Sequence, residues 1–289
     1  MSDSGTTAFV LSSGVLLLIT LLVSLRMRSK DPYGLFHLTL NKLPSQDPKL
    51  PPATEWLNMG YWKNTQSFPA ACQDVGHGTG ESLLLLLSEP SLPQLSHLVG
   101  VTSLEVHHQR SVERVQKYQK VHNTDTIVDL YHADAICTSS GAFHPLSVFS
   151  EETFDSILAL DCAYHFKTRR LFLEQAHDKL VPGGTVALAD ICFSSQALET
   201  RWTRSLTSIL RLMPRDNMIS KEDYVVQLQQ IGYIDVVLED ITANVFPSFS
   251  RFLKSQGWGW WVLGTVIDWY ASAGARFVII SGKKATSTT

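Results

Sequence analysis

Two hydrophobic periods alternate along residues 82–284. Short runs of Val, Ile and Leu have the length of buried strands, and the longer stretches between them carry apolar residues every three or four positions, as amphipathic helices do. Strands are predicted at His97–Thr102, Thr126–Ala135 (a strand with its exit loop), Phe154–Asp161, Thr185–Asp190, Ile231–Val237 and Arg276–Ser281, and helices at Ser82–Ser88, Glu105–Lys120, Thr168–Leu180 and Lys221–Gln230. This alternation predicts an α/β fold with a mostly parallel sheet and helices on both of its faces.

One more strand is expected at Ala70–Gln73, just ahead of a glycine-rich run, and it would bring the sheet to seven strands. Buried strands of a parallel sheet are near-continuous apolar runs. Gln73 stands where an aliphatic residue is expected, so this strand is predicted to be short or partly exposed.

Residues 8–25 carry no charge and are dominated by Leu, Val and Ile. As a helix they would span about 27 Å, close to the hydrocarbon thickness of a bilayer. Arg26, Arg28 and Lys30 follow at once, whereas a secretory signal would place its positive residues first. We therefore predict a single-pass anchor in the endoplasmic reticulum or another endomembrane, with the domain that follows it cytosolic. A cleaved signal and a peripheral apolar hairpin are the alternatives.

Composition narrows the range of partners. The formal net charge is -3, with 24 basic and 27 acidic residues, so the basic excess typical of nucleic-acid-binding proteins is missing. The four cysteines form no C-x-x-C pair, and the ten histidines form no H-x-x-x-H pair. Neither a metal site nor a disulfide framework is predicted from these patterns.

Residues 74–80 read Asp-Val-Gly-His-Gly-Thr-Gly, just before an apolar helical segment. Glycine lets the backbone approach a ligand closely, and the free N–H groups at a helix start bind polar groups. An ordinary tight turn is the alternative. The G-x-G-x-G spacing differs from the G-x-G-x-x-G fingerprint of dinucleotide-binding proteins. That spacing, and the absence of a Tyr-x-x-x-Lys pair after the fourth strand, disfavour a nicotinamide-dependent oxidoreductase.

The run resembles the first motif of the class I S-adenosylmethionine (SAM)-dependent methyltransferases, D/E-x-G-x-G-x-G. The resemblance extends over about residues 54–284, with N-x-G-Y-W at 58–62, F-D-x-I at 154–157 and L-x-P-G-G at 180–184. It implies a Rossmann-like sheet whose last strand is antiparallel, and a helical cap at about 193–230. The remaining parts are then the anchor at 1–30, a proline-rich connector at 31–53 and a tail at 285–289. The similar branch contains macrolide-sugar O-methyltransferases, alkaloid N-methyltransferases and sterol or cyclopropane-type methyltransferases.

The resemblance also implies the contacts to SAM. The glycine run would form the cofactor bed, aromatic side chains would cover the methionine end, and the ends of the second and third strands would hold ribose and adenine. The implied residues are Asp74, Gly76, Gly78 and Gly80 for the bed, Tyr61 and Trp62 for the cover, Thr102 and Gln109 for ribose with Glu105 as a competing candidate, and Asp134 and Ala135 for adenine. The aromatic side chains could instead cover the edge of the core, and Asp134 could be a plain turn residue.

Asp161, Tyr164 and His165 follow the fourth predicted strand, and ligands of open parallel sheets lie at the carboxyl ends of strands. An imidazole has a pKa near 6.5, which suits a general base at neutral pH. We take His165 as the base and Asp161 or Tyr164 as the group that orients the substrate. The alternative is that His165 caps the helix that follows.

The predicted function is a membrane-anchored methyltransferase that methylates O or N of a small acceptor. Because the anchor would confine the enzyme to a membrane, we expect that acceptor to be lipophilic. A non-catalytic, membrane-tethered protein with this fold is the other candidate. Four tryptophans between 258 and 269 predict a helix, for which core packing is favoured over interfacial anchoring.

Overall fold

The computed structural model describes residues 40–43, 47, 49, 52, 54–73, 79–138, 144–199 and 213–286. The predicted anchor at 8–25 and most of the glycine run, residues 74–78, lie outside these ranges. Among the helices within them, none is long and apolar enough to cross a membrane.

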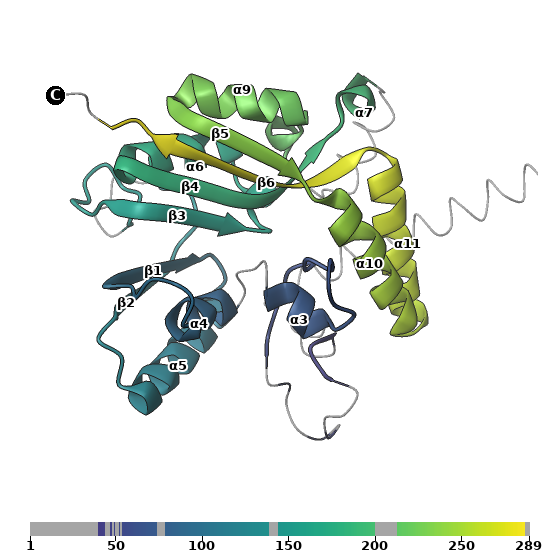
Figure 1. Cartoon of the computed structure of the whole chain (residues 1–289), viewed down its shortest axis with the longest axis horizontal. Coiled ribbons are helices and arrows are strands. Elements are labelled where there is room, and N and C mark those ends of the chain that lie inside the picture. Colours follow the sequence, from purple (N-terminus) through teal and green to yellow (C-terminus); the bar gives the residue numbers. More distant parts are fainter. Residues whose placement is uncertain are drawn as a thin grey trace, which may run out of the picture.

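The strands form two separate sheets (Figure 1). In the smaller, β1 (His97–Thr102) pairs in parallel with β2 (Ile127–His132). In the larger, the order is β3 (Phe154–Leu160), β4 (Leu180–Phe193), β6 (Ala275–Lys284) and β5 (Tyr233–Asp240). β3 and β4 are parallel, whereas β6 is antiparallel to both of its neighbours, as expected for the last strand.

Helices lie between the strands along most of the chain. They are α3 (Phe68–Gln73), α4 (Glu81–Ser88), α5 (Glu105–His122), α6 (Arg169–Lys179), α7 (Ser195–Glu199), α9 (Lys221–Ile231), α10 (Thr242–Ser255) and α11 (Trp258–Ser272), with the 3-10 turns η1 (Ala163–His165) and η2 (Arg215–Asn217). Six strands and five helices, α11 among them, were predicted close to their observed positions, whereas α10 was not anticipated.

The predicted strand at Ala70–Gln73 is wrong, because these residues lie in α3. Pro69 in the first turn and two alanines after it favour a helix, and Phe68, Ala71 and Cys72 bury its apolar side. The described residues therefore contain six strands rather than seven. Within them β1 and β3 each pair on one side only, so no described strand joins the two sheets.

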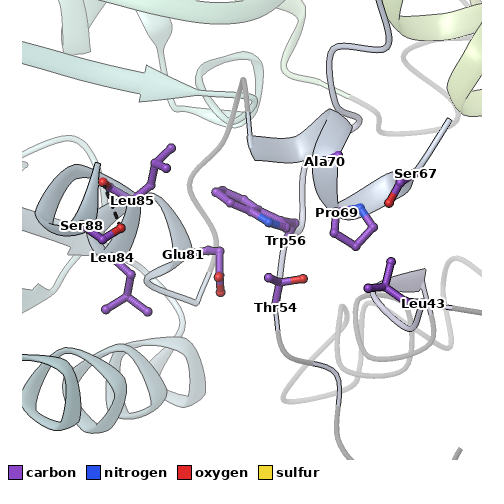
Figure 2. Close-up of a pocket in the computed structure, with 10 residues that line it drawn as sticks. All are labelled: Leu43, Thr54, Trp56, Ser67, Pro69, Ala70, Glu81, Leu84, Leu85 and Ser88. Atoms are coloured by element: carbon purple, nitrogen blue, oxygen red, sulfur yellow. Dashed lines mark hydrogen bonds between the residues drawn. The ribbon is translucent and has the colours of Figure 1, made fainter. Parts of the chain in front are cut away.

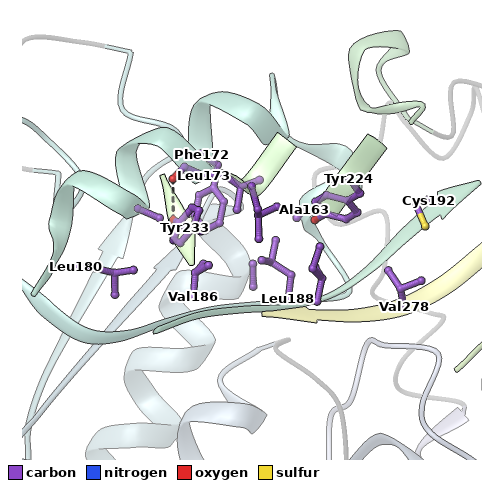
Figure 3. Packing of buried hydrophobic residues seen from close by; sticks show 14 of the residues in the cluster. Ala163, Phe172, Leu173, Leu180, Val186, Leu188, Cys192, Tyr224, Tyr233 and Val278 are labelled. Atoms are coloured by element: carbon purple, nitrogen blue, oxygen red, sulfur yellow. Dashed lines mark hydrogen bonds between the residues drawn. The ribbon is translucent and has the colours of Figure 1, made fainter. Parts of the chain in front are cut away.

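The larger sheet is covered on both faces because residues of β4 alternate between them. Val186 and Leu188 point to one face, where they pack with residues of α6 and α9 (Figure 3). Ile191 and Phe193 belong to a second cluster, which contains residues of α10 and α11. The L-x-P-G-G motif at 180–184 lies inside β4, where the register skips from Leu180 to Thr185.

Helix α11 exposes a stripe of tryptophans, so the expectation of core packing is wrong for three of them. The exposed fractions are 79% for Trp258, 52% for Trp261 and 37% for Trp269. These positions, with Thr265 between them, recur on one face of an α-helix. The opposite face is buried through Gly264 and Tyr270.

We predict that backbone amides along the open edges of β1 and β3 exchange hydrogen faster than those of β6. Amides at an unpaired edge contact water, whereas β6 has a strand on each side. Residue-resolved hydrogen exchange measures the difference. Equal protection of β1, β3 and β6 would mean that another strand pairs with the open edges in solution.

Candidate active site

The end of β3 places three of the predicted residues in one tight turn. Asp161 follows the strand in the left-handed conformation (φ 55°), and η1 then carries Tyr164 and His165. The turn ends before α6, whose N-cap is Thr168, with its hydroxyl accepting from the backbone N–H of Leu171 at 3.3 Å. The alternative that His165 caps this helix is therefore wrong.

Asp161 connects this turn to the N-terminal part of the chain. Its Oδ2 accepts from the backbone N–H of Met59 at 2.8 Å, and its own N–H donates to the carbonyl of Ala189 at 2.7 Å. Burial raises the pKa of the Asp161 carboxyl to about 7, although the hydrogen bonds from Met59 and Tyr164 act in the opposite direction. Near neutral pH the carboxyl is therefore divided between its charged and neutral forms.

His165 lies beside Tyr164, with 4.2 Å between the ring centroids. The residue is exposed in part to solvent, but desolvation by the surrounding protein disfavours the charged form and lowers the pKa of His165. The side chain is thus mostly neutral at pH 7 and able to accept a proton.

Trp62 occupies a buried aromatic cluster rather than an open surface. The side chain is 7% exposed, its ring centroid lies 5.3 Å from that of Phe252, and its indole N–H donates to the carbonyl of Met59 at 2.7 Å. The structure thus gives Trp62 a packing role, as in the alternative that this aromatic segment covers the core. Tyr61 is half-buried and packs against the cluster that contains Phe246.

A partly buried ion-pair network holds the end of the glycine run against α5. Glu55 accepts from Arg110 Nε at 2.5 Å and Nη2 at 2.6 Å, and from the hydroxyl of Thr79 at 2.9 Å. Arg114 binds Glu81 in the first turn of α4. Burial works against the charge on Glu55, but the hydrogen bond from Arg110 and the charge of Arg114 together outweigh it, and the pKa of Glu55 is lowered.

Gly80 is the one glycine of the predicted bed within the described ranges. It precedes α4 with φ 92°, and a Cβ there would lie 3.2 Å from Ser111 of α5. Only glycine adopts this conformation readily. Asp74, Gly76 and Gly78 lie outside the described residues, so their contacts stay predictions.

The predicted ribose and adenine residues lie on the smaller sheet and the segments that follow its strands. Thr102 is half-buried at the carboxyl end of β1, whereas Gln109 is exposed on α5 and donates to Glu105 at 3.2 Å. Asp134 is exposed after β2, and its carboxylate accepts from Ile136 N at 3.3 Å, as a turn aspartate does. Ala135 beside it is half-buried.

A pocket of about 310 Å³ opens between α3 and α4 (Figure 2). Its walls include Trp56, Pro69 and Leu85, with Glu81 at one side. None of the predicted site residues lines it, so it is separate from the turn that bears His165. Among the described residues, no group of three or more His, Cys, Asp or Glu side chains is placed to hold a metal ion.

The sequence interpretation missed a fully buried ion pair behind the η1 turn. Arg169 Nη1 donates to Asp190 Oδ2 at 2.7 Å, and the two side chains are 1% and 0% exposed. One signal was present, because Asp190 is a charged residue inside the apolar strand β4 and a buried charge requires a partner.

No family model matches the chain. Two curated proteins resemble it in sequence. The erythromycin 3''-O-methyltransferase of Saccharopolyspora erythraea is 30% identical over 103 residues, 34% of each chain. The O-methyltransferase resE of Aspergillus sclerotiorum is 23% identical over 224 residues, 77% of each chain. The match to the first relative thus spans only about a third of its length.

Solved structures share the fold at low sequence identity. The cyclopropane synthase MmaA2 of Mycobacterium tuberculosis superposes with a TM-score of 0.54 at 15% identity, over 73% of this chain and 76% of that one. In sequence and in fold, the chain is similar to class I SAM-dependent methyltransferases. The resemblance drawn from the motifs is thus confirmed.

Two further structures have the same fold. The [4+2]-cyclase SpnF gives a TM-score of 0.53 at 15% identity, over 80% of this chain and 89% of that one. Phosphoethanolamine N-methyltransferase 2 of Haemonchus contortus gives 0.52 at 18% identity, over 72% of this chain and 47% of that one. At such identities the likeness concerns the fold alone.

We predict that Asp161→Asn removes a pH dependence of stability. The raised pKa of Asp161 means that its carboxyl stays protonated in the folded chain from about pH 4 to 7, where the unfolded chain ionises. The free energy of unfolding of the wild type should therefore fall by a few kcal/mol, roughly, as the pH rises through this window. Urea unfolding at pH 4, 5.5 and 8 measures it.

Asp155→Asn is the matched control, because Asp155 is exposed on the same strand. It should keep the pH dependence of the wild type. If Asp161→Asn also kept that dependence, Asp161 would not carry the raised pKa.

Proposed function

We propose that the chain is a SAM-dependent methyltransferase acting on O or N of a small, lipophilic acceptor. The observation that carries the proposal is the η1 turn, which places a mostly neutral His165 beside Tyr164 at the carboxyl end of β3. Asp161 joins this turn to Met59, next to the predicted aromatic cover. The two curated relatives are both O-methyltransferases, which supports the same chemistry.

The residues present fit SAM in part. Gly80 has the left-handed backbone expected of a glycine bed, and it leads into α4, whose first N–H groups can face a polar ligand. Thr102, at the carboxyl end of β1, would contact the ribose. When bound, SAM supplies a methyl group activated by its sulfonium.

The chain's own residues would position the acceptor and move its proton. In-line transfer requires the nucleophile to be held close to the methyl carbon, so positioning accounts for much of the rate. His165 would take the proton from an acceptor hydroxyl or ammonium at its unprotonated ring nitrogen. Tyr164 and Asp161 would orient the acceptor beside it.

A second candidate is a protein of this fold that transfers no methyl group. The helix α3, present where a strand was expected to support the glycine run, favours it. The neighbour SpnF is a [4+2]-cyclase, so this fold is not restricted to methyl transfer.

The test combines binding with turnover. Calorimetry on the full chain should show binding of SAM and none of NADH, and incubation of membranes with labelled SAM should label an extractable small molecule. His165→Ala should lower kcat at least about a hundredfold, the contribution of a general base, and leave SAM affinity unchanged. In the wild type, kcat/KM should decline only below about pH 6.5, because the pKa of His165 is lowered.

His122→Ala is the matched control, since His122 is exposed at the end of α5. It should keep wild-type turnover. Binding of SAM without labelling of any extracted molecule would favour the non-catalytic candidate. Binding of NADH but not of SAM would favour an oxidoreductase. Unchanged turnover in His165→Ala would remove that residue from the mechanism.

Two features support the proposal that the protein acts at a membrane surface. The uncharged run at 8–25 is followed by three basic residues. The stripe of Trp258, Trp261 and Trp269 on α11 is exposed. Indole rings favour the interface between headgroups and acyl chains because they are apolar but carry one N–H donor. Asp268, at the margin of the tryptophan stripe, forms an ion pair with Lys254, so its negative charge would be neutralised near the lipid.

Quenching by lipid tests this surface. The full chain is placed in phosphatidylcholine vesicles with brominated acyl chains, which quench tryptophans in contact with them. Residues 1–30 contain no tryptophan, so the signal reports on the rest of the chain. We expect quenching in the wild type and its loss in a variant with Trp258, Trp261 and Trp269 replaced by Ser.

Trp260→Phe is the control, since Trp260 packs against the cluster of Leu253, and it should be quenched like the wild type. Thr265→Glu, with a charge at the centre of the stripe, should lose quenching without removing any ring. An absence of quenching in the wild type would refute the membrane contact. If the wild type forms a dimer in the absence of vesicles and the triple variant does not, the tryptophan stripe would instead contact a second copy of the chain.

A further inference from the structure

A cluster of buried polar side chains lies behind the turn that bears His165. Its members come from four elements: Arg169 from α6, Asp190 from β4, Asn217 from η2 and Tyr224 from α9. Each is at most 1% exposed. Burying such a cluster costs free energy unless its hydrogen bonds are made, so its presence in the core requires a physical explanation.

One half of the cluster fixes Arg169. Its Nη1 donates to Asp190 Oδ2 at 2.7 Å and to the carbonyl of Ile191 at 3.0 Å. The hydroxyl of Tyr224 donates to the same carboxylate oxygen at 2.8 Å, and the Tyr224 ring lies 4.2 Å from the guanidinium carbon. The guanidinium is therefore anchored to the larger sheet.

The other half is the amide of Asn217. Its Nδ2 donates to the carbonyls of Tyr164 at 3.0 Å and Phe166 at 2.8 Å, which flank His165 on both sides. Its Oδ1 accepts from the backbone N–H of Arg169 at 2.9 Å, and its own carbonyl accepts from Arg169 Nη2 at 2.6 Å. Both amide hydrogens of Asn217 are thus used on the turn that carries the proposed base.

We propose that Asn217 is a positioning residue that holds His165 in place and couples its turn to the predicted cap, of which Asn217 is part. The inference rests on the proposed function of His165. Asn217 lies within the predicted cap at about 193–230, as the last residue of η2. A displacement of residues 213–217 is therefore passed to the two carbonyls beside His165, because Asn217 holds both of them.

The geometry separates positioning from mere stabilisation. Tyr233 is also buried, and its hydroxyl donates to the carbonyl of Leu173 at 2.8 Å. That bond joins β5 to the middle of α6 and touches no atom of η1. Tyr233→Phe therefore removes one buried hydrogen bond while leaving the surroundings of His165 intact.

The test compares Asn217→Asp and Asn217→Ser with Tyr233→Phe. The aspartate side chain keeps the size and the acceptor but cannot donate to the carbonyls. The serine side chain is too short to bridge both. We expect kcat to fall at least tenfold in both Asn217 variants, with KM for SAM unchanged, and to stay at the wild-type value in Tyr233→Phe.

The pKa of His165, followed by the NMR shift of its ring protons, gives a readout independent of turnover. It should rise in both Asn217 variants, because a loosened turn hydrates the imidazole and, in Asn217→Asp, the introduced carboxylate adds a nearby negative charge. It should not move in Tyr233→Phe. If Asn217→Asp does not fold, the serine variant decides.

An unchanged pKa of His165 and unchanged kcat in the folded Asn217 variants would overturn the inference. The same fall in kcat in all three variants would reduce Asn217 to a stabilising role. If the wild type methylates nothing, the proposed function fails, while the titration of His165 still decides whether Asn217 positions the turn.

Discussion

The arrangement of the molecule depends on one short segment, residues 55–62, because no ladder of backbone hydrogen bonds joins the two sheets within the described part of the chain. Glu55 at one end is paired with Arg110 of α5, and so ties the smaller sheet's helices to the segment. Met59 binds Asp161 at the end of β3, and the N–H of Trp62 donates to the carbonyl of Asn244 in α10 at 2.8 Å. Side chains and single amides therefore perform a task that a shared strand performs in a continuous sheet.

Burial shapes the electrostatics of the turn after β3. It raises the pKa of Asp161 and lowers that of His165, because a low-dielectric surrounding disfavours either charge. Both shifts bring the turn toward neutrality near pH 7. The full charges nearby, on Arg169 and Asp190, are paired with each other and lie behind the turn.

The sequence predicted those elements whose own residues decide their structure. His97–Thr102 is a strand in both the prediction and the structure, since its apolar residues pack whether or not the neighbouring edge is filled. Ala70–Gln73 was mispredicted because the expectation came from the motif that follows, whereas Pro69 and the alanines favour a helix. For the tryptophans of α11, periodicity predicted a helix correctly but carries no information on whether a partner covers each face.

The contacts of the site were harder to anticipate. Met59 and Asp161 are 102 positions apart, and Asn217 and Tyr164 are 53 apart, so no local pattern links them. The site residues chosen from motifs that adjoin strand ends, Asp161, Tyr164 and His165, do share one turn. Gln109 was implied by the family resemblance, as a glutamine that follows the second predicted strand, and it is exposed on α5 beside Glu105.

The separation of the two sheets has a thermodynamic consequence for any ligand that contacts both. Such a ligand binds the arrangement in which the sheets are correctly placed, so its observed dissociation constant is the intrinsic one divided by the fraction of molecules in that arrangement. A change in residues 55–62 can therefore weaken binding without removing a single ligand contact. Affinity in this fold is in part a measure of how well its two halves are held together.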